Sequence, residues 1–298
     1  MYLWGWAGGD MDVVQKAEVL IEALPYLRRF KGKVVVVKYG GSAMASPTEE
    51  SLLLDLIFLE TVGIRPVLVH GGGHAISRRM EEEGLEAKFV QGLRVTDERT
   101  MKIVEETLFG EVNKGLVEGI RKLGGRAEGL SGKEHKILHV RRHKVKVQDY
   151  ELDIGFVGDV RKVEPEPILR LCGRGIIPVV APIGLGEDGR AYNVNADTAA
   201  GEIAVALGAE KLAFLTDVEG ILRDPDDPGS LISTLPVGDV EELIDRGIIK
   251  GGMIPKVRAC AEAVRRGVPK AHIVDGRVPH ALLLEIFTDK GVGTEIVP

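Results

Sequence analysis

The segment VVVVKYGGSAM, residues 34–44, decides which fold class the chain can adopt. Four consecutive valines predict a strand that is covered on both faces, because a strand with one solvent-exposed face alternates apolar and polar residues. Lys38 follows the valines directly, and Gly40 and Gly41 come after Tyr39. A fixed positive charge and two glycines at the end of a buried strand raise the question of whether this loop binds an anion, although for one loop alone a tight strand–helix turn is the simpler explanation.

Apolar runs of the same kind recur along the chain, at residues 33–39, 65–70, 175–184, 211–217 and 270–276. Segments with helical spacing of apolar residues lie between them, at 46–62, 97–123 and 196–207, each followed by a glycine. Strands that alternate with helices form a parallel sheet with helices on both faces. The chain is therefore predicted to be an α/β protein with a mostly parallel central sheet, which binds ligands at the carboxyl ends of its strands.

The helix predicted at 46–62 has clear start signals. Ser46 suits the N-cap position and Pro47 the first helical position. Glu49 lies three residues after Ser46, as in a capping box.

Residues 1–31 are predicted to be a leader followed by a helix. Met11 could equally start the chain, and residues 1–10 are apolar without the positive charge of a signal peptide. Over residues 12–30 apolar side chains recur at helical spacing, and Pro25 inside this pattern predicts a kinked or broken helix. Because this helix precedes the first strand, we expect it to be an extension that docks on another element.

Composition excludes several classes of protein. Hydrophobic residues make up 44% of the 298 residues and charged residues 28%, which is ordinary for a globular protein. The net charge of −6 provides no overall basic field for nucleic acid, and no run of about 18 apolar residues predicts a membrane span. The two cysteines, Cys172 and Cys260, form no CxxC pattern. We therefore expect neither a disulfide framework nor a zinc site, and a location in the reducing cytoplasm.

Local patterns in the middle of the chain predict hairpins and turns. Residues 130–160 contain short stretches of alternating apolar and polar residues, which are typical of hairpins. A GxGxxG pattern occurs at residues 184–189, but an extended segment follows it where a dinucleotide-binding fingerprint needs a helix. This pattern is interpreted as a turn near the boundary between two lobes. No GxxxxGK[ST] motif occurs, so the chain is not a P-loop protein.

Three histidines, His135, His139 and His143, recur every four residues, a spacing that would suggest a metal site on a helix. Their neighbours have the pattern of a strand, and no carboxylate or cysteine completes a ligand set. No metal site is predicted from them.

Two glycine-rich loops follow predicted strands directly. They are KYGG at residues 38–41 and HGGG at residues 70–73. Glycines let backbone N–H groups approach an anion closely, and two such loops at neighbouring strand ends favour an oxyanion cradle over two ordinary tight turns. His70 and His74 flank the second loop and are interpreted as packing or capping residues.

Further polar residues are candidates for binding, each with a structural alternative. Asn195 can cap the helix that starts near residue 196 and Asp197 can favour its positive end, but neither role requires Asn193. Lys256 lies in the first turn of a predicted helix, which is unfavourable unless an anion is near, although it could also be an ordinary surface lysine. Arg94 suits a carboxylate, but taken alone it is equally a surface arginine.

These segments, taken together and in order, resemble the amino acid kinase family. The matching segments are VVVVKYGGSAM, VLVHGGGHAIS, GLRVT, NVNADTAA, LTDVEGIL and GGMIPKV. Within the family the chain is similar to the branch that phosphorylates the side-chain carboxylate of N-acetyl-L-glutamate in arginine biosynthesis. The resemblance covers about residues 12–298. It implies a three-layer αβα sandwich with an acyl-substrate lobe at residues 32–184 and an ATP lobe at residues 185–298.

The resemblance implies a role for each matching residue. Lys38 and Lys256 would hold the transferring phosphoryl group from opposite ends, and Asp197 would orient both lysines. The acyl substrate would bind to Gly72, Gly73, Arg94, Asn193 and Asn195. ATP, with Mg²⁺ bound through its phosphates, would bind to Gly40, Gly41, Thr216, Asp217, Val218, Gly220, Leu222 and Met253.

The two ends of the chain resemble the arginine-sensitive members of that branch. There the N-terminal helix joins dimers into a ring-shaped homohexamer, a trimer of dimers, and L-arginine binds between this helix and the C-terminal region as a feedback inhibitor. Residues 272–297 match that C-terminal region, except that Glu295 stands where methionine is more usual. The sequence leaves open whether a PII-type signalling protein also binds.

Two other functions remain as alternatives. One is a related carboxylate kinase that acts on another acid, such as a carrier-linked aminoadipate. The other is a non-catalytic sensor of arginine or nucleotide on the same fold, which would have no need to retain Lys38, Lys256 and Asp197 together.

Overall fold

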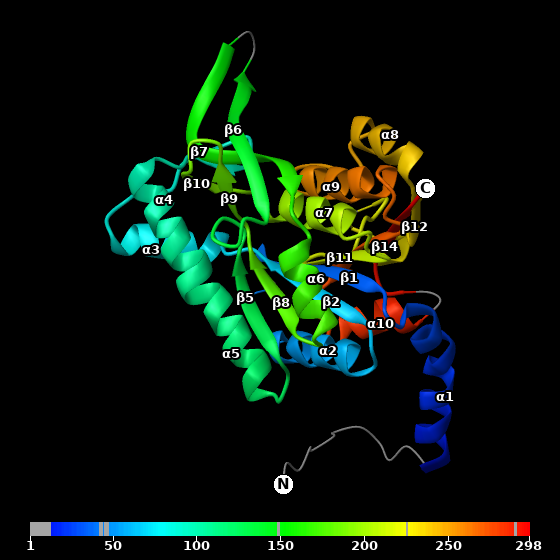
Figure 1. Ribbon diagram of the computed structural model, residues 1–298. Helices are drawn as coiled ribbons and strands as arrows, with labels where there is room; N and C mark the ends of the chain where they lie inside the picture. Colours follow the sequence, from blue (N-terminus) through cyan, green and yellow to red (C-terminus); the bar gives the residue numbers. More distant parts are fainter. Residues whose placement is uncertain (1–12, 42–43, 45–47, 148–149, 225, 289–290) are drawn as a thin grey trace.

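The strand that contains the four valines lies inside an eight-stranded sheet between two layers of helices (Figure 1). The computed structural model describes residues 13–298 apart from 42–43, 45–47, 148–149, 225 and 289–290. The order of the strands is β12 (Thr234–Pro236), β14 (Thr294–Val297), β13 (Ala271–Asp275), β11 (Lys211–Thr216), β1 (Val34–Tyr39), β2 (Arg65–His70), β8 (Ile177–Ala181) and β5 (Ala127–Ser131). Neighbouring strands of this sheet are parallel except β13 and β14, so the predicted fold class is confirmed.

The run of valines is buried because both faces of β1 are covered. Val35 and Val37 pack in a core with residues of α2 (Glu49–Thr61), α5 (Lys114–Lys122) and α10 (Ala281–Phe287). Val34 and Val36 pack in a second core with residues of α6 (Glu166–Gly173), α7 (Ala196–Ala206) and α9 (Met253–Arg265). The four side chains are at most 7% exposed, which explains why the sequence shows no alternation here.

The hairpins predicted at 130–160 are present as one long pair. The strands β6 (Leu138–Val147) and β7 (Tyr150–Val163) are antiparallel and project from the body of the molecule (Figure 1). With β9 (Ile183–Gly186) and β10 (Ala191–Asn193) they close a small barrel. The GxGxxG pattern forms the end of β9 and the turn that leads to β10, and no helix follows it, as the sequence predicts.

The predicted start of α2 is wrong, and the helix break that the sequence allows at Pro25 is absent. α1 (Val13–Phe30) continues through Pro25 without a break. α2 begins at Glu49 rather than at Pro47, and its N-cap residue is Thr48, which makes no side-chain capping bond. The Thr48 hydroxyl donates instead to the backbone oxygen of Gly276, at 2.8 Å. The predicted cap Ser46 lies outside the described residues, as does Pro47.

The single helix predicted at 97–123 is divided into three parts. α4 (Glu98–Glu105) and α5 are separated by η2 (Glu106–Asn113), a π-helical segment in which each turn contains an additional residue. The spacing of apolar residues does not reveal such a segment. Its inward side chains, Leu108 and Asn113, lie near the second glycine loop and help to shape it.

A buried carboxylate connects α2 to the start of α10. Asp55 is 1% exposed and accepts a hydrogen bond from the imidazole of His280 at 2.6 Å. The backbone N–H groups of Leu282 and Leu283 also bond to this carboxylate, so it caps a helix that is distant in the sequence. Burial raises the pKa of Asp55 from 3.8 to about 6, in spite of these bonds.

This raised pKa predicts a pH-dependent stability. The folded protein holds the Asp55 proton up to pH about 6, whereas the unfolded chain releases it near 3.8. Relative to the Asp55→Asn variant, the wild type should therefore lose free energy of unfolding as the pH rises from about 4 to about 6, by at most about 3 kcal/mol. Urea unfolding at several pH values measures this difference. The exposed Asp245→Asn variant is the control and should keep the pH dependence of the wild type. The same pH dependence in the wild type and in Asp55→Asn would contradict the prediction.

Candidate active site

A cavity of about 400 Å³ lies at the carboxyl ends of β1 and β2, where the sequence places the two glycine loops. It brings together residues from distant parts of the chain. The predicted site residues that line it are Lys38, Gly41, Gly72, Gly73, Arg94, Asn193, Asn195, Asp197 and Lys256.

One carboxylate bridges the two lysines of this cavity. An oxygen of Asp197 lies 2.8 Å from Nζ of Lys38, and the other oxygen accepts a hydrogen bond from Nζ of Lys256 at 3.1 Å. Asp197 lies in the first turn of α7, where the side chain of Asn195 caps the helix by accepting from the N–H groups of Asp197 and Thr198. The sequence predicts this cap, and the cap fixes the direction from which the carboxylate enters the cavity.

Because Lys38 and Asp197 are buried, the pKa of each depends on the charges of its neighbours. Lys38 is 4% exposed and Asp197 is 7% exposed. Burial lowers the pKa of Lys38, and the charge of Lys256 lowers it further, while Asp197 opposes both effects. Burial alone would raise the pKa of Asp197, but the two lysines outweigh it and hold this pKa below its usual value. The triad therefore carries two positive charges and one negative charge, which leaves a net positive centre for an anionic ligand.

Gly40 in the first loop and Gly72 in the second are closely packed, whereas Gly41 and Gly73 have open space around them. A Cβ atom at Gly40 would lie 3.0 Å from Nζ of Lys38 and 3.3 Å from the Cα atom of Gly71. A Cβ atom at Gly72 would lie 2.5 Å from a methyl group of Leu108. The backbone N–H of Gly71 donates to the oxygen of Tyr39 at 2.7 Å, so the two loops are bonded to each other. They form one rigid wall beside the lysines.

Arg94 is a buried part of the site and not a surface residue. Its guanidinium donates to the backbone oxygen of Gly73 at 2.9 Å and to the hydroxyl of Ser77 at 2.7 Å. It also lies over the ring of Phe89, 4.8 Å from the ring centre. These contacts hold the cation at the wall of the cavity, where it can bind a carboxylate.

A second cavity, of about 440 Å³, lies beyond the end of β11. Of the residues predicted to bind nucleotide, it is lined by Asp217, Val218, Gly220, Leu222 and Met253. Thr216 does not line it. The Thr216 hydroxyl donates to the backbone oxygen of Val218 at 3.1 Å, within the loop that follows β11. Lys250 and Arg277 also line this cavity, and neither was predicted to bind nucleotide.

The two cavities together suit a reaction between two anionic molecules. Lysine ammonium groups and loop N–H groups stabilise a phosphoryl group in transfer, and this reaction requires positioning and positive charge more than a strong base. Within the described residues no group of three or more His, Cys, Asp and Glu side chains could hold a metal ion. His143, for example, bonds to Asp159 alone, at 2.6 Å.

A model of the amino acid kinase family matches residues 33–275. The chain belongs to the amino acid kinase family.

Relatives with assigned activities match nearly the whole chain. It is 53% identical to an acetylglutamate kinase of Heliobacterium modesticaldum over 293 residues, which cover 96% of this chain and 99% of that protein. It is 52% identical to an acetylglutamate kinase of Moorella thermoacetica, over 97% of this chain and 99% of that protein. The family branch predicted from the motifs is thereby confirmed.

A solved structure supports the same architecture. The N-acetylglutamate synthase of Neisseria gonorrhoeae, in complex with coenzyme A and N-acetyl-glutamate, has a TM-score of 0.82 and is 28% identical. The match covers 97% of this chain but 64% of the synthase. The same synthase in complex with coenzyme A and L-arginine has a TM-score of 0.76 at 27% identity, over 96% of this chain and 66% of that one.

Several residues around this amino acid kinase site were given no role in the site by the sequence analysis, although His70 was interpreted as a packing or capping residue. Ser77 positions Arg94, and the hydroxyl of Thr96 lies 3.4 Å from the side-chain nitrogen of Asn193. His70 is fully buried behind the second glycine loop, next to Asn113. The VLVHGGGHAIS and GLRVT segments contain His70, Ser77 and Thr96, so the position of these residues next to site residues was the available signal. In the part of the chain that the structure describes, no helix is long and apolar enough to cross a membrane.

Proposed function

We propose that this member of the amino acid kinase family transfers the γ-phosphoryl group of ATP to the side-chain carboxylate of N-acetyl-L-glutamate. The observation that carries the proposal is the bridge from Lys38 through Asp197 to Lys256, in the same cavity as Arg94. The identity of about 50% to acetylglutamate kinases along almost the full chain supports this choice of substrate. The product, N-acetyl-L-glutamyl 5-phosphate, would serve arginine biosynthesis in the cytoplasm.

The residues of the cavity suffice for this chemistry without a general base. The attacking carboxylate of the substrate is already ionised at neutral pH, so no proton has to be removed. The transition state carries negative charge on the equatorial, attacking and leaving oxygens. Lys38 and Lys256 lie on either side of Asp197, so they can stabilise charge at both ends of the transferring group. The N–H groups of the glycine loops would add fixed dipoles.

Each substrate has a separate place in this arrangement. The guanidinium of Arg94 would bind the second carboxylate of the acyl substrate, with Asn193 and Asn195 on the same wall. ATP would occupy the second cavity, with its phosphates directed toward Lys256. Mg²⁺ bound to the phosphates would neutralise part of their charge, and the lack of a protein ligand cluster among the described residues fits a metal held by the nucleotide.

A coupled assay of ADP release tests the proposal. N-acetyl-L-glutamate should support turnover, and a longer diacid such as an aminoadipate derivative should support much less. Robust turnover of the longer diacid alone would favour the related carboxylate kinase. Nucleotide or arginine binding without any turnover would favour a non-catalytic sensor.

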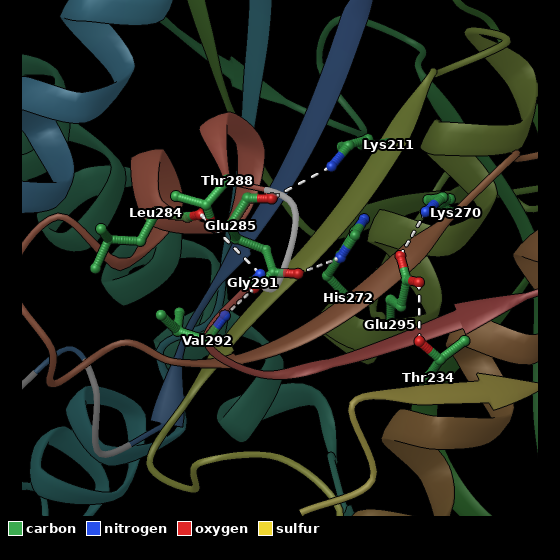
Figure 2. A network of polar contacts seen from close by, with 10 residues as sticks. All are labelled: Lys211, Thr234, Lys270, His272, Leu284, Glu285, Thr288, Gly291, Val292 and Glu295. Atoms are coloured by element: carbon green, nitrogen blue, oxygen red, sulfur yellow. Dashed lines mark hydrogen bonds and ion pairs between the residues drawn. The ribbon is translucent and has the colours of Figure 1, made fainter. Parts of the chain in front are cut away.

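A third cavity is the place where L-arginine would act as an inhibitor (Figure 2). α1 supplies Tyr26, Arg29 and Phe30 to its wall, and the C-terminal segments supply His272 and Glu285. The carboxylate of Glu285 contacts the imidazole of His272 at 2.6 Å and accepts from the N–H of Val292 at 2.8 Å. This carboxylate is a suitable partner for a guanidinium or ammonium group.

Glu295 gives this chain a second carboxylate in the cavity, where the arginine-sensitive branch more often has methionine. It accepts hydrogen bonds from Lys270 at 2.6 Å and from Thr234 at 3.0 Å (Figure 2). Lys270 therefore neutralises the additional carboxylate, and Glu285 remains the acidic group for the ligand. The arginine-bound synthase structure, which has the same fold, supports an arginine site in this chain.

We further propose that α1 joins dimers into a homohexamer. Its exposed apolar residues include Val19, Leu20, Ile21 and Leu24, which are 39–68% exposed. Such a stripe requires a partner, and the matching helix of a second copy has the same apolar character.

The double variant Leu20→Glu, Ile21→Glu should therefore dissociate the hexamer into dimers. Charges at both positions would be buried without partners in a helix–helix contact. Because α1 also lines the proposed arginine cavity, the variant should need several-fold more L-arginine for half-maximal inhibition. Light scattering and inhibition curves measure the two effects. Tyr150→Glu, an exposed apolar residue on the hairpin, is the control, and an unchanged hexamer in the double variant would contradict the prediction.

A further inference from the structure

His70 is a buried histidine with two defined contacts beside the second glycine loop. It is fully buried and lines none of the cavities described above. Its Nδ1 lies 2.7 Å from the backbone oxygen of Gly71, and its Nε2 lies 3.0 Å from the side-chain nitrogen of Asn113. The same nitrogen of Asn113 donates to the backbone oxygen of Val179 at 2.8 Å.

These contacts fix the tautomer of the imidazole. A carbonyl oxygen can only accept, so Nδ1 must carry the proton and donate to Gly71. The amide nitrogen of Asn113 can only donate, so Nε2 must be the unprotonated acceptor. A protonated ring would place two donors face to face at Nε2. Burial lowers the pKa of His70 to about 4, which agrees with a neutral ring.

The contact to Gly71 determines the direction of the next N–H group. A trans peptide is planar, so the carbonyl of Gly71 and the N–H of Gly72 point to opposite sides. The carbonyl points to the buried ring of His70, and the N–H of Gly71 is already bonded to Tyr39. The N–H of Gly72 is therefore directed away from the core, on the side where Gly71, Gly72 and Gly73 line the cavity.

We propose that His70, held by Asn113, is a positioning residue that keeps the Gly72 N–H directed at the transferring phosphoryl group. This inference rests on the proposed kinase function. The π-helical segment supplies both Asn113 and Leu108, the latter packed against Gly72, so the segment is the support on which the loop is shaped. A glycine peptide without the histidine contact can rotate, since glycine has no side chain to resist the change.

Side-chain replacements separate the two contacts of His70. Asn at position 70 can keep a donor near the Nδ1 position, whereas Gln places its amide near the Nε2 position. We expect His70→Asn to keep kcat within about fivefold, and His70→Gln to lower kcat by about 10²–10³-fold, the typical loss for one donor to a developing anion. The KM for N-acetyl-L-glutamate should change less than threefold in both. Equal losses in the two variants, or normal kcat in His70→Gln, would overturn the proposal.

Ile120→Val is the matched control for a structural effect. Ile120 is fully buried on α5, the helix that continues the π segment, and does not line the cavity. This variant should lose thermal stability without losing kcat. A kcat loss that follows thermal stability equally in all three variants would show that His70 acts only in folding.

Nitrogen NMR of histidine-labelled wild type gives a test that needs no turnover. The His70 signals should show a neutral ring protonated at Nδ1 between pH 6 and 8, and the signals should change in Asn113→Leu. A ring protonated at Nε2, or a ring that titrates in this range, would overturn the proposal. This result does not depend on which acid the enzyme phosphorylates. An inactive wild type with the expected tautomer would count against the proposed function instead.

Discussion

Replacing Lys38 by methionine should lower kcat about 10²–10³-fold while ATP still binds. The ammonium group of Lys38 lies at the end of β1 with one carboxylate oxygen 2.8 Å away, and it is almost completely buried. A buried charge of this kind contributes most where negative charge develops in the transition state. Methionine has a similar length and no charge, so the cavity should keep its shape and lose only the electrostatic contribution.

Lys33→Met is the control for this variant. Lys33 immediately precedes the same strand and pairs with Glu210 at 3.3 Å, but its side chain is 54% exposed. Removal of a surface ion pair should change stability little and kcat not at all. The ADP-release assay and a direct titration with ATP separate turnover from binding. Normal turnover in Lys38→Met would mean that the phosphoryl group is not transferred beside this strand.

The sequence was most informative where a function depends on a local motif at the end of a strand. The valine run, the two glycine loops and the helix-capping pattern around Asn195 each lie within a few residues. Because the carboxyl ends of parallel strands meet at one edge of the sheet, recognising the strands was sufficient to bring Lys38 and the glycine loops together. Asp197 was joined to them only by the family resemblance. The structure places these groups in one cavity.

The sequence was least informative where a contact joins distant residues without any periodic signal. Asp55 and His280 are 225 residues apart, and His70 and Asn113 are 43 apart. Neither pair has a spacing that a helix or a strand would explain. A π-helical segment also escapes detection, because one additional residue per turn leaves the apolar residues close to ordinary helical spacing.

The continuous helix through Pro25 shows a second limit. Proline removes one backbone donor and disfavours helix in its vicinity, so the sequence predicts a kink or break. Contacts of α1 with the rest of the chain outweigh this cost. Tyr26 packs edge-on against Phe287 of α10, and Phe30 is 2% exposed in the core. Tertiary packing of the last turn therefore holds the helix together on the far side of the proline.

Replacing Asp197 by asparagine should lower kcat by at least about 10²-fold and shift the pH dependence in a defined direction. In the wild type the carboxylate raises the pKa of Lys38 against burial and against the charge of Lys256. Without the carboxylate both remaining effects lower this pKa. Lys38 acts as the protonated ammonium, so activity is present below its pKa and is lost as the pH rises through it. The alkaline fall of kcat/KM should therefore occur at lower pH in Asp197→Asn than in the wild type.

Measurement of kcat/KM from pH 6 to 10 tests this shift, since this ratio reports the free enzyme. Glu202→Gln is the control, because Glu202 lies on the same helix and pairs with Arg266 away from the cavity. It should keep both the rate and the wild-type pH profile. In Asp197→Asn, a lower pH should restore part of the lost activity, because protonation of Lys38 then no longer needs the carboxylate. If the variant instead shows the wild-type alkaline limb with a uniformly lower rate, Asp197 acts by orienting the lysines and not by keeping Lys38 charged.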